Sequence, residues 1–146
     1  MNAKRLGRGA RKGQALVEFA LVLPLFILLV CAMIDFGWML LLTHNLTNAA
    51  RVGCRVGTLP GSQTADVQQA VTNFFNRIGF SGLTFTVTVE VRDANGVLRP
   101  TGLAASQYGD QVFVGVSSPM PVLTGLIMRY MGGSPTARGR CAFRHE

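Results

Sequence analysis

The sequence predicts an α+β protein in which a long amino-terminal helix is followed by a small head of one helix packed on about three antiparallel strands. Two patterns support this fold class. Nearly every residue from Ala15 to Leu42 is apolar or small, and beyond residue 61 apolar spacing of helical period gives way to strict alternation. The 146 residues suffice for one small domain plus an extra element. We therefore divide the chain into a basic leader (1–13), a transmembrane and stalk helix (14–57) and a head (58–146).

The first element is predicted to span a membrane. Residues 15–34 form an apolar stretch interrupted only by Glu18 and Pro24. At 1.5 Å per residue this length matches a hydrocarbon core about 30 Å thick. Pro24 removes one helix donor, so we expect a kink there.

Charge placement predicts the orientation of this helix. Five of the fourteen basic residues lie in the first thirteen positions without any acid, whereas the rest of the chain holds nine arginines against seven acids. Basic residues resist translocation, so the amino terminus is expected in the cytoplasm and the head outside it. Asp35 and Trp38 would then lie near the outer membrane interface. Since most of the net charge of +7 belongs to the leader, we predict no nucleic-acid partner.

A cleavable secretory signal is an alternative for the same segment. The basic start and the apolar run fit it, and Val30-Cys31-Ala32 resembles a cleavage site. However, Met33–Leu42 continues the apolar run with a single charge, which outlasts an ordinary signal peptide.

Glu18 is the residue that a plain membrane anchor does not explain. A carboxylate in an apolar helix costs roughly 2.5–3.5 kcal/mol at the membrane centre and less near the interface. It is either a tolerated interfacial charge or a residue with a charged partner. Cutting the chain after Gly13 would supply that partner, because the new α-amino group of Gln14 lies one helical turn away.

The residues around this position resemble a known processing site. A basic leader, Gly13, four apolar or small residues, Glu18, the aromatic Phe19 and an apolar helix are similar to the prepilin peptidase site of type IV pilin-like proteins. The string GQALVEFALVLP from Gly13 to Pro24, with IDFG from Ile34 and LTNAAR from Leu46, resembles more narrowly the TadE-like pseudopilins of tight-adherence (Tad or Flp) pili. The resemblance covers residues 8–57.

This resemblance implies a minor pilin or pseudopilin that is cut after Gly13 and takes part in pilus assembly and surface adhesion. Phe19 stands where major pilins of the group usually carry Tyr, which suggests a minor subunit. The implied partners are the prepilin peptidase, major and other minor pilins, the inner-membrane assembly platform and membrane lipid. The implied location is the bacterial inner membrane, with one span and a periplasmic head, and then the extracellular pilus. Whether Gln14 is methylated or cyclised stays open, and cyclisation would remove the charge that Glu18 is expected to meet.

Beyond the membrane the helix is predicted to continue as an amphipathic stalk. Leu42, Leu46, Ala49, Gly53 and Val56 form its apolar stripe, and Gly57, Pro60 and Gly61 end it. His44 on this stalk has no second ligand at metal-binding spacing, so we predict no metal site.

The head is predicted from its periodicity. Residues 62–79 read as a helix with Ser62 or Thr64 as cap, Asp66 in the first turn and Gly79 at the stop. Its predicted apolar face consists of Val67, Ala70, Val71, Phe74, Phe75 and Ile78. Strands are predicted at 83–92 and 112–116, with a turn over 93–96, a brief return at 97–99 and a short helix or packed loop at 122–131. A last strand over 136–145 has Cys141 and Phe143 inward and Arg138, Arg140 and Arg144 outward.

The three cysteines, Cys31, Cys54 and Cys141, lack the CxxC spacing of a metal site. A disulfide between Cys54 and Cys141 is permitted if their side of the membrane is oxidising, and two buried free thiols are an equal alternative.

No enzyme or cofactor is predicted. The head lacks a phosphate-binding loop, a nucleophile elbow and an HExxH motif, and its acids share no catalytic spacing. Besides the pilin, two alternatives stay open: an uncleaved single-pass scaffold or binding module of an inner-membrane assembly or secretion complex, and a small secreted enzyme.

Overall fold

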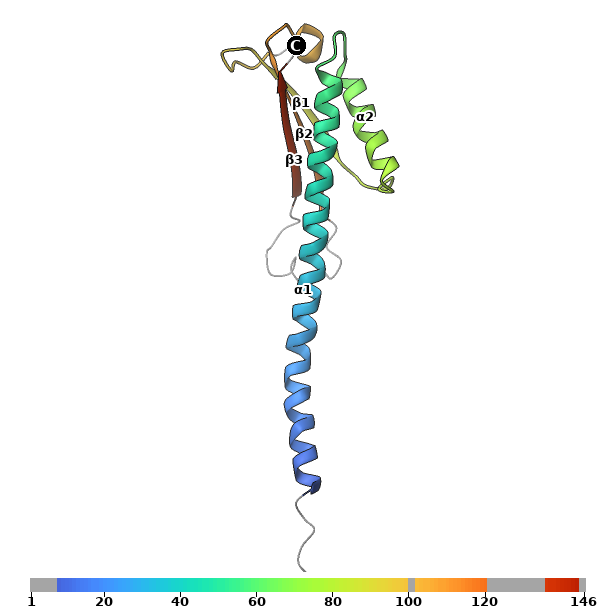
Figure 1. Ribbon diagram of the computed structural model, residues 1–146, viewed down its shortest axis with the longest axis vertical. Coiled ribbons are helices and arrows are strands. Elements are labelled where there is room, and N and C mark those ends of the chain that lie inside the picture. Colours follow the sequence, from blue (N-terminus) through green and yellow to red (C-terminus); the bar gives the residue numbers. More distant parts are fainter. Residues whose placement is uncertain (1–7, 100–101, 121–135, 145–146) are drawn as a thin grey trace, which may run out of the picture.

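The computed structural model describes residues 8–99, 102–120 and 136–144, with side chains from Gly13 onward except Ala105. The elements follow in the order α1 (Arg8–Gly57), α2 (Thr64–Arg77), β1 (Thr86–Arg92), the short 3₁₀ helix η1 (Gly102–Ala105), β2 (Gln111–Pro119) and β3 (Thr136–Arg144). Figure 1 shows α1 as the long axis of the molecule, with the other elements gathered around its carboxyl-terminal end. The predicted α+β architecture is confirmed.

The helix α1 is longer than predicted at its start. It comprises 50 residues and begins at Arg8 rather than at Gln14, so it includes part of the predicted leader. Ala, Arg and Lys are good helix formers, and residues 8–12 are rich in them. The helix runs on through Pro24, which lies inside it.

The second helix, α2, begins one residue after its cap, Gln63. The backbone N–H of Gln63 donates to Asp66 Oδ2 at 2.8 Å, so the predicted role of Asp66 in the first turn is confirmed. The predicted caps Ser62 and Thr64 are wrong. The Ser62 hydroxyl instead donates to the carbonyl of Gly57, one of the carbonyls that the end of α1 leaves unpaired.

The three strands form one antiparallel sheet in the order β1-β2-β3. In its register Val91 pairs with Val112 and Val114 pairs with Cys141, which sets these side chains on the same face. β2 runs three residues beyond its predicted end, because Ser118 is buried and its hydroxyl donates to the carbonyl of Thr84 at 2.8 Å. The predicted turn over 93–96 is confirmed, with Asp93 Oδ1 accepting from the N–H groups of Asn95 and Val97.

The core forms where α1 meets both the sheet and α2. Its buried apolar side chains come from every element of the head and from the second half of α1: Leu42, Leu46, Ala49, Ala50, Cys54, Val67, Val71, Phe75, Val91, Leu103, Val112, Val114, Val116 and Ala137. In Figure 1 α1 runs between the sheet and α2. The stalk is therefore part of the head's core, not a separate support.

Two predicted core residues lie at its margin. Ile78 is 37% exposed because α2 ends at Arg77, one residue before it. Phe143 shares the inward side of β3 with Cys141 but is 45% exposed, since it lies one residue from the end of the strand. Arg138, Arg140 and Arg144 are exposed, as predicted. The predicted element at 122–131 lies outside the described residues.

Candidate processing and assembly segment

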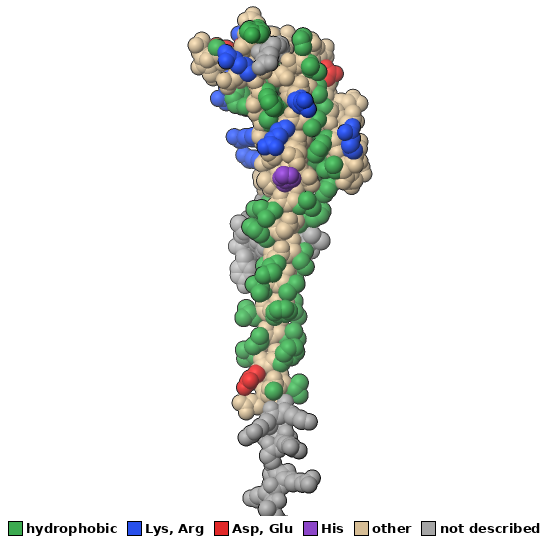
Figure 2. All heavy atoms as spheres, viewed as in Figure 1, with side chains coloured by type: hydrophobic (Ala, Val, Ile, Leu, Met, Phe, Trp, Pro, Cys, Tyr) green, Lys and Arg blue, Asp and Glu red, His purple; other side chains and the backbone are tan. Residues whose placement is uncertain are grey.

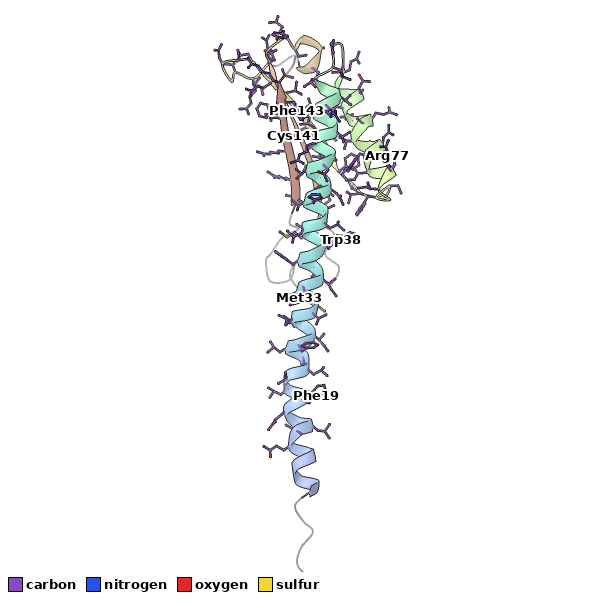
Figure 3. The ribbon with its side chains drawn as sticks, viewed as in Figure 1. Phe19, Met33, Trp38, Arg77, Cys141 and Phe143 are labelled. Atoms are coloured by element: carbon purple, nitrogen blue, oxygen red, sulfur yellow. The ribbon has the colours of Figure 1, made fainter. Side chains whose placement is uncertain are left out.

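The predicted processing segment, Gly13–Phe19, lies near the start of α1, and each of its residues is exposed. A side chain built at Gly13 would meet no atom within 4 Å, so the peptide bond after it is open on this side. Phe19 is 61% exposed, and Figure 3 shows it on the part of α1 that lies far from the head. The residues of the sequence motif therefore lie on one accessible stretch of helix.

Gln14 and Glu18 are in contact on this surface. The Gln14 side-chain amide donates to Glu18 Oε1 at 3.2 Å, across one helical turn. Among the side chains that the structure describes, Glu18 has no cationic partner. The contact supplies one hydrogen bond but leaves the negative charge uncompensated.

The apolar half of α1 is exposed along its length. Every residue from Gly13 to Val30 is exposed, and the part of the chain that the structure describes holds one helix long and apolar enough to cross a membrane. Figure 2 shows hydrophobic side chains covering this half, with an acidic side chain near its start. So large an exposed apolar surface marks a membrane or protein contact.

The exposed half ends where α1 enters the head. Asp35 is 8% exposed, and Trp38 is half-buried, with its ring centroid 5.9 Å from that of Phe80. Figure 3 places Trp38 on α1 below the head. The contact between Trp38 and Phe80 could not be predicted from the sequence, because Phe80 lies in an irregular segment that has no periodicity. Trp38 is thus packed partly by the protein itself, besides its predicted place at the membrane interface.

The structure also brings Cys54 of α1 and Cys141 of β3 together, as free thiols. Burial raises the pKa of the Cys54 thiol to about 12, with a smaller contribution from the adjacent Cys141 thiol. Among the described residues no three His, Cys, Asp or Glu side chains gather in a way that would hold a metal ion, and His44 is exposed on α1.

An exposed apolar helix that continues into an α+β head defines a membrane-anchored protein with one predicted span. Comparison with known families then narrows the class. Residues 13–55 match the model of a family described as TadE-like protein, and this bears out the predicted resemblance to TadE-like proteins of the Tad pilus system. The match ends where the stalk ends, so it covers the helix and not the head. This family is not a family of enzymes. No curated protein and no solved structure matches the chain.

Proposed function

We propose that the chain is a minor pilin or pseudopilin of a Tad-type pilus, cut between Gly13 and Gln14 and then packed into the filament through its apolar helix. The observation that carries this proposal is the exposed apolar surface from Gly13 to Val30, which belongs to the segment with the family match. A membrane covers this surface before assembly, and neighbouring helices cover it afterwards.

Processing removes the basic leader and changes the electrostatics of the helix start. The leader's positive charges keep the precursor's amino terminus in the cytoplasm. After the cut, the α-amino group of Gln14 becomes the nearest cation to Glu18. In an apolar filament the pair fixes the axial register of neighbouring subunits, because leaving either charge unmatched is costly.

The contact between Gln14 and Glu18 bears on the fate of the new amino terminus. Cyclisation joins the α-nitrogen of Gln14 to its own side-chain carbonyl carbon and releases the side-chain nitrogen as ammonia. Both the amino charge and the amide donor that now reaches Glu18 would be lost. Glu18 would then have neither partner, so we propose that Gln14 stays uncyclised in the assembled subunit.

The Gly13–Gln14 bond lies within α1, six residues from its first residue. This placement favours a second candidate function, an uncleaved inner-membrane scaffold, because a helical peptide bond is a poor protease substrate until it unfolds locally. Gly13 weakens the helix at this point by about 1 kcal/mol relative to Ala, and helix ends open readily. Local opening at Gly13 therefore reconciles the helix with the cut.

Amino-terminal sequencing of the full protein, recovered from membranes and from sheared pili, tests processing. We expect the mature chain to begin at Gln14 with its side-chain amide intact, that is, without the loss of ammonia that cyclisation causes. The Gly13→Ala variant should stay at precursor size, since Ala stabilises the helix and adds a side chain at the cut. A chain that still begins at Met1, or one that begins near Met33, would overturn the proposal. A Gly13→Ala variant with the same size and the same activity as the wild type would favour the uncleaved scaffold.

A further inference from the structure

Two cysteines that are far apart in the sequence meet inside the head. Cys54 lies near the end of α1 and is fully buried, and Cys141 lies in β3 and is half-buried against the core. In Figure 3 Cys141 lies on β3 where that strand runs beside α1. The third cysteine, Cys31, is on the other half of α1, beyond the described core.

The contacts of Cys54 locate its sulfur over the ladder between β2 and β3. Its Sγ lies 3.8 Å from the carbonyl oxygen of Val112 and also interacts with the backbone at Val114 and Phe143. Val112 pairs with Phe143, and Val114 pairs with Cys141, so these contacts belong to two successive pairs on the same face of that ladder. Cys141 shares the inward face with Val114, and its thiol interacts directly with that of Cys54.

Small residues bring the two elements close enough for such a contact. Gly139, two residues before Cys141, lies against the α1 backbone at Leu46 and Thr47, where a Cβ would overlap backbone atoms. Gly53, next to Cys54, instead lets α1 approach α2 and β2, with Val67, Val71 and Val114 each 3.2 Å from a Cβ built there, and β2 is the strand that pairs with β3. A disulfide needs Cα atoms about 4.4–6.8 Å apart, and a close helix–strand contact of this kind permits it.

We propose that Cys54 and Cys141 are oxidised to an intramolecular disulfide that fastens the last strand of the head to the stalk helix. The proposal rests on the proposed function in one respect, the location of the head outside the cytoplasm, where disulfides persist. It assigns the bond to this pair and leaves Cys31 reduced.

The oxidant is a disulfide-bearing thiol oxidase or a small-molecule disulfide. The thiolate of Cys141, the more exposed of the two, attacks the oxidant and forms a mixed disulfide while one oxidant sulfur leaves. Cys54 then loses its proton and attacks Cys141 Sγ, and the second oxidant sulfur leaves. Two protein thiols are oxidised to one disulfide, and the oxidant's disulfide is reduced to two thiols that take up the two protons.

Burial of Cys54 has a kinetic consequence for this sequence. A raised pKa leaves little Cys54 thiolate at neutral pH, so the second step is slow in a folded head. The bond is therefore expected to close while the head is still folding, and reagents that reach only exposed thiols should not reopen it.

The test uses full-length protein, acid-quenched in cells, alkylated under denaturing conditions and mapped by mass spectrometry without reduction. We expect one cross-linked peptide pair that contains Cys54 and Cys141, with only Cys31 alkylated. Cys31→Ser is the matched control and should keep the cross-link, whereas Cys141→Ser should leave Cys54 alkylated. Reduction should lower the unfolding midpoint of the detergent-solubilised protein by roughly 10–20 °C, because the bond closes a loop of most of the head.

Alkylation of all three cysteines in the wild type, or a bond that joins two chains, would overturn the proposal. A second experiment treats purified, reduced protein with glutathione disulfide, once folded and once after brief unfolding. If neither sample forms the bond, Cys54 and Cys141 do not lie at a distance that a disulfide can bridge. Failure of the disulfide is distinguishable from failure of the proposed function. A chain that begins at Gln14 without a cross-link refutes only the disulfide, and a cross-linked chain that begins at Met1 refutes only the processing.

Discussion

At the scale of single residues, the thiol of Cys54 is buried in the head beside the thiol of Cys141. Nothing near Cys54 in the sequence indicates a perturbed thiol, since its neighbours are Gly53 and Arg55. The perturbation arises from burial by β2 and β3 and from the adjacent Cys141 thiol, and both are tertiary effects. Sequence patterns could name the two cysteines as possible partners, but only the fold shows that they meet.

The raised pKa of Cys54 predicts how the reduced protein responds to alkaline pH. The unfolded thiol ionises near pH 9.0, and the folded thiol keeps its proton to about pH 12. Between these values the unfolded state binds fewer protons, so the free energy of unfolding should fall as pH rises from 9.0 and level off near 12. Denaturant unfolding of the full chain in detergent, with reductant present, measures this slope.

Cys54→Ala removes the titrating group and is the control for all other alkaline effects. Its stability should fall less steeply over the same pH range than that of the reduced wild type, whatever its absolute stability. The disulfide-bonded protein should resemble Cys54→Ala in slope. Identical slopes for reduced wild type and Cys54→Ala would show that Cys54 is not perturbed in the folded protein.

At the scale of elements, periodicity predicted the type of α1, α2 and the three strands but not the short helix η1, and tertiary contacts decided where several of these elements end. β2 extends to Pro119 because buried Ser118 finds a partner in Thr84, which no alternation rule can show. The stripe of Leu42, Leu46 and Ala49 was predicted correctly. The start of α1 at Arg8 differs from the predicted boundary at Gln14, because that boundary follows the predicted processing site and not a helix-start signal.

The contact between β3 and α1 yields a prediction about Gly139. A methyl group there would overlap the α1 backbone at Leu46 and Thr47, which cannot move aside as a flexible side chain can. We expect Gly139→Ala to destabilise the head by about 3 kcal/mol, or to lower its unfolding midpoint by more than ~10 °C. Gly82→Ala is the matched control, because a side chain at Gly82 meets nothing within 4 Å, and it should change stability little. Equal midpoints for the two variants would contradict the close packing of β3.

At the scale of the whole molecule, α1 has two functions along one continuous helix. Its first half presents an apolar surface with Glu18 near the start, and its second half completes the core of the head. The family match ends at residue 55, close to the end of this helix. The proposed processing and packing are therefore expected to depend on α1, whereas the head lies outside the family match.

Replacing Glu18 tests the proposed register device. Glu18→Ala should be cut normally after Gly13, but its incorporation into pili should fall on the order of a hundredfold, as expected for a buried charge left without its partner. Immunoblots of sheared pili and of membranes, together with amino-terminal sequencing, separate the two effects. Gln14→Ala keeps the α-amino group and loses only the side-chain donor, so it should still assemble. Normal incorporation of Glu18→Ala would remove the role assigned to Glu18.

The continuity of α1 from Arg8 to Gly57 also fixes the rotation of the head about the helix axis relative to the first half of α1. No loop separates the half that is proposed to pack among other helices from the half that holds the head, so the direction in which the head faces is fixed by the number of residues between them. Each residue turns the helix by about 100° and lengthens it by about 1.5 Å. One residue added between Phe36 and Leu41 would swing the head by more than a quarter turn around the filament axis, whereas seven would return it nearly to its original azimuth. The number of residues in this segment thus sets the direction in which the head faces around the axis of the proposed filament.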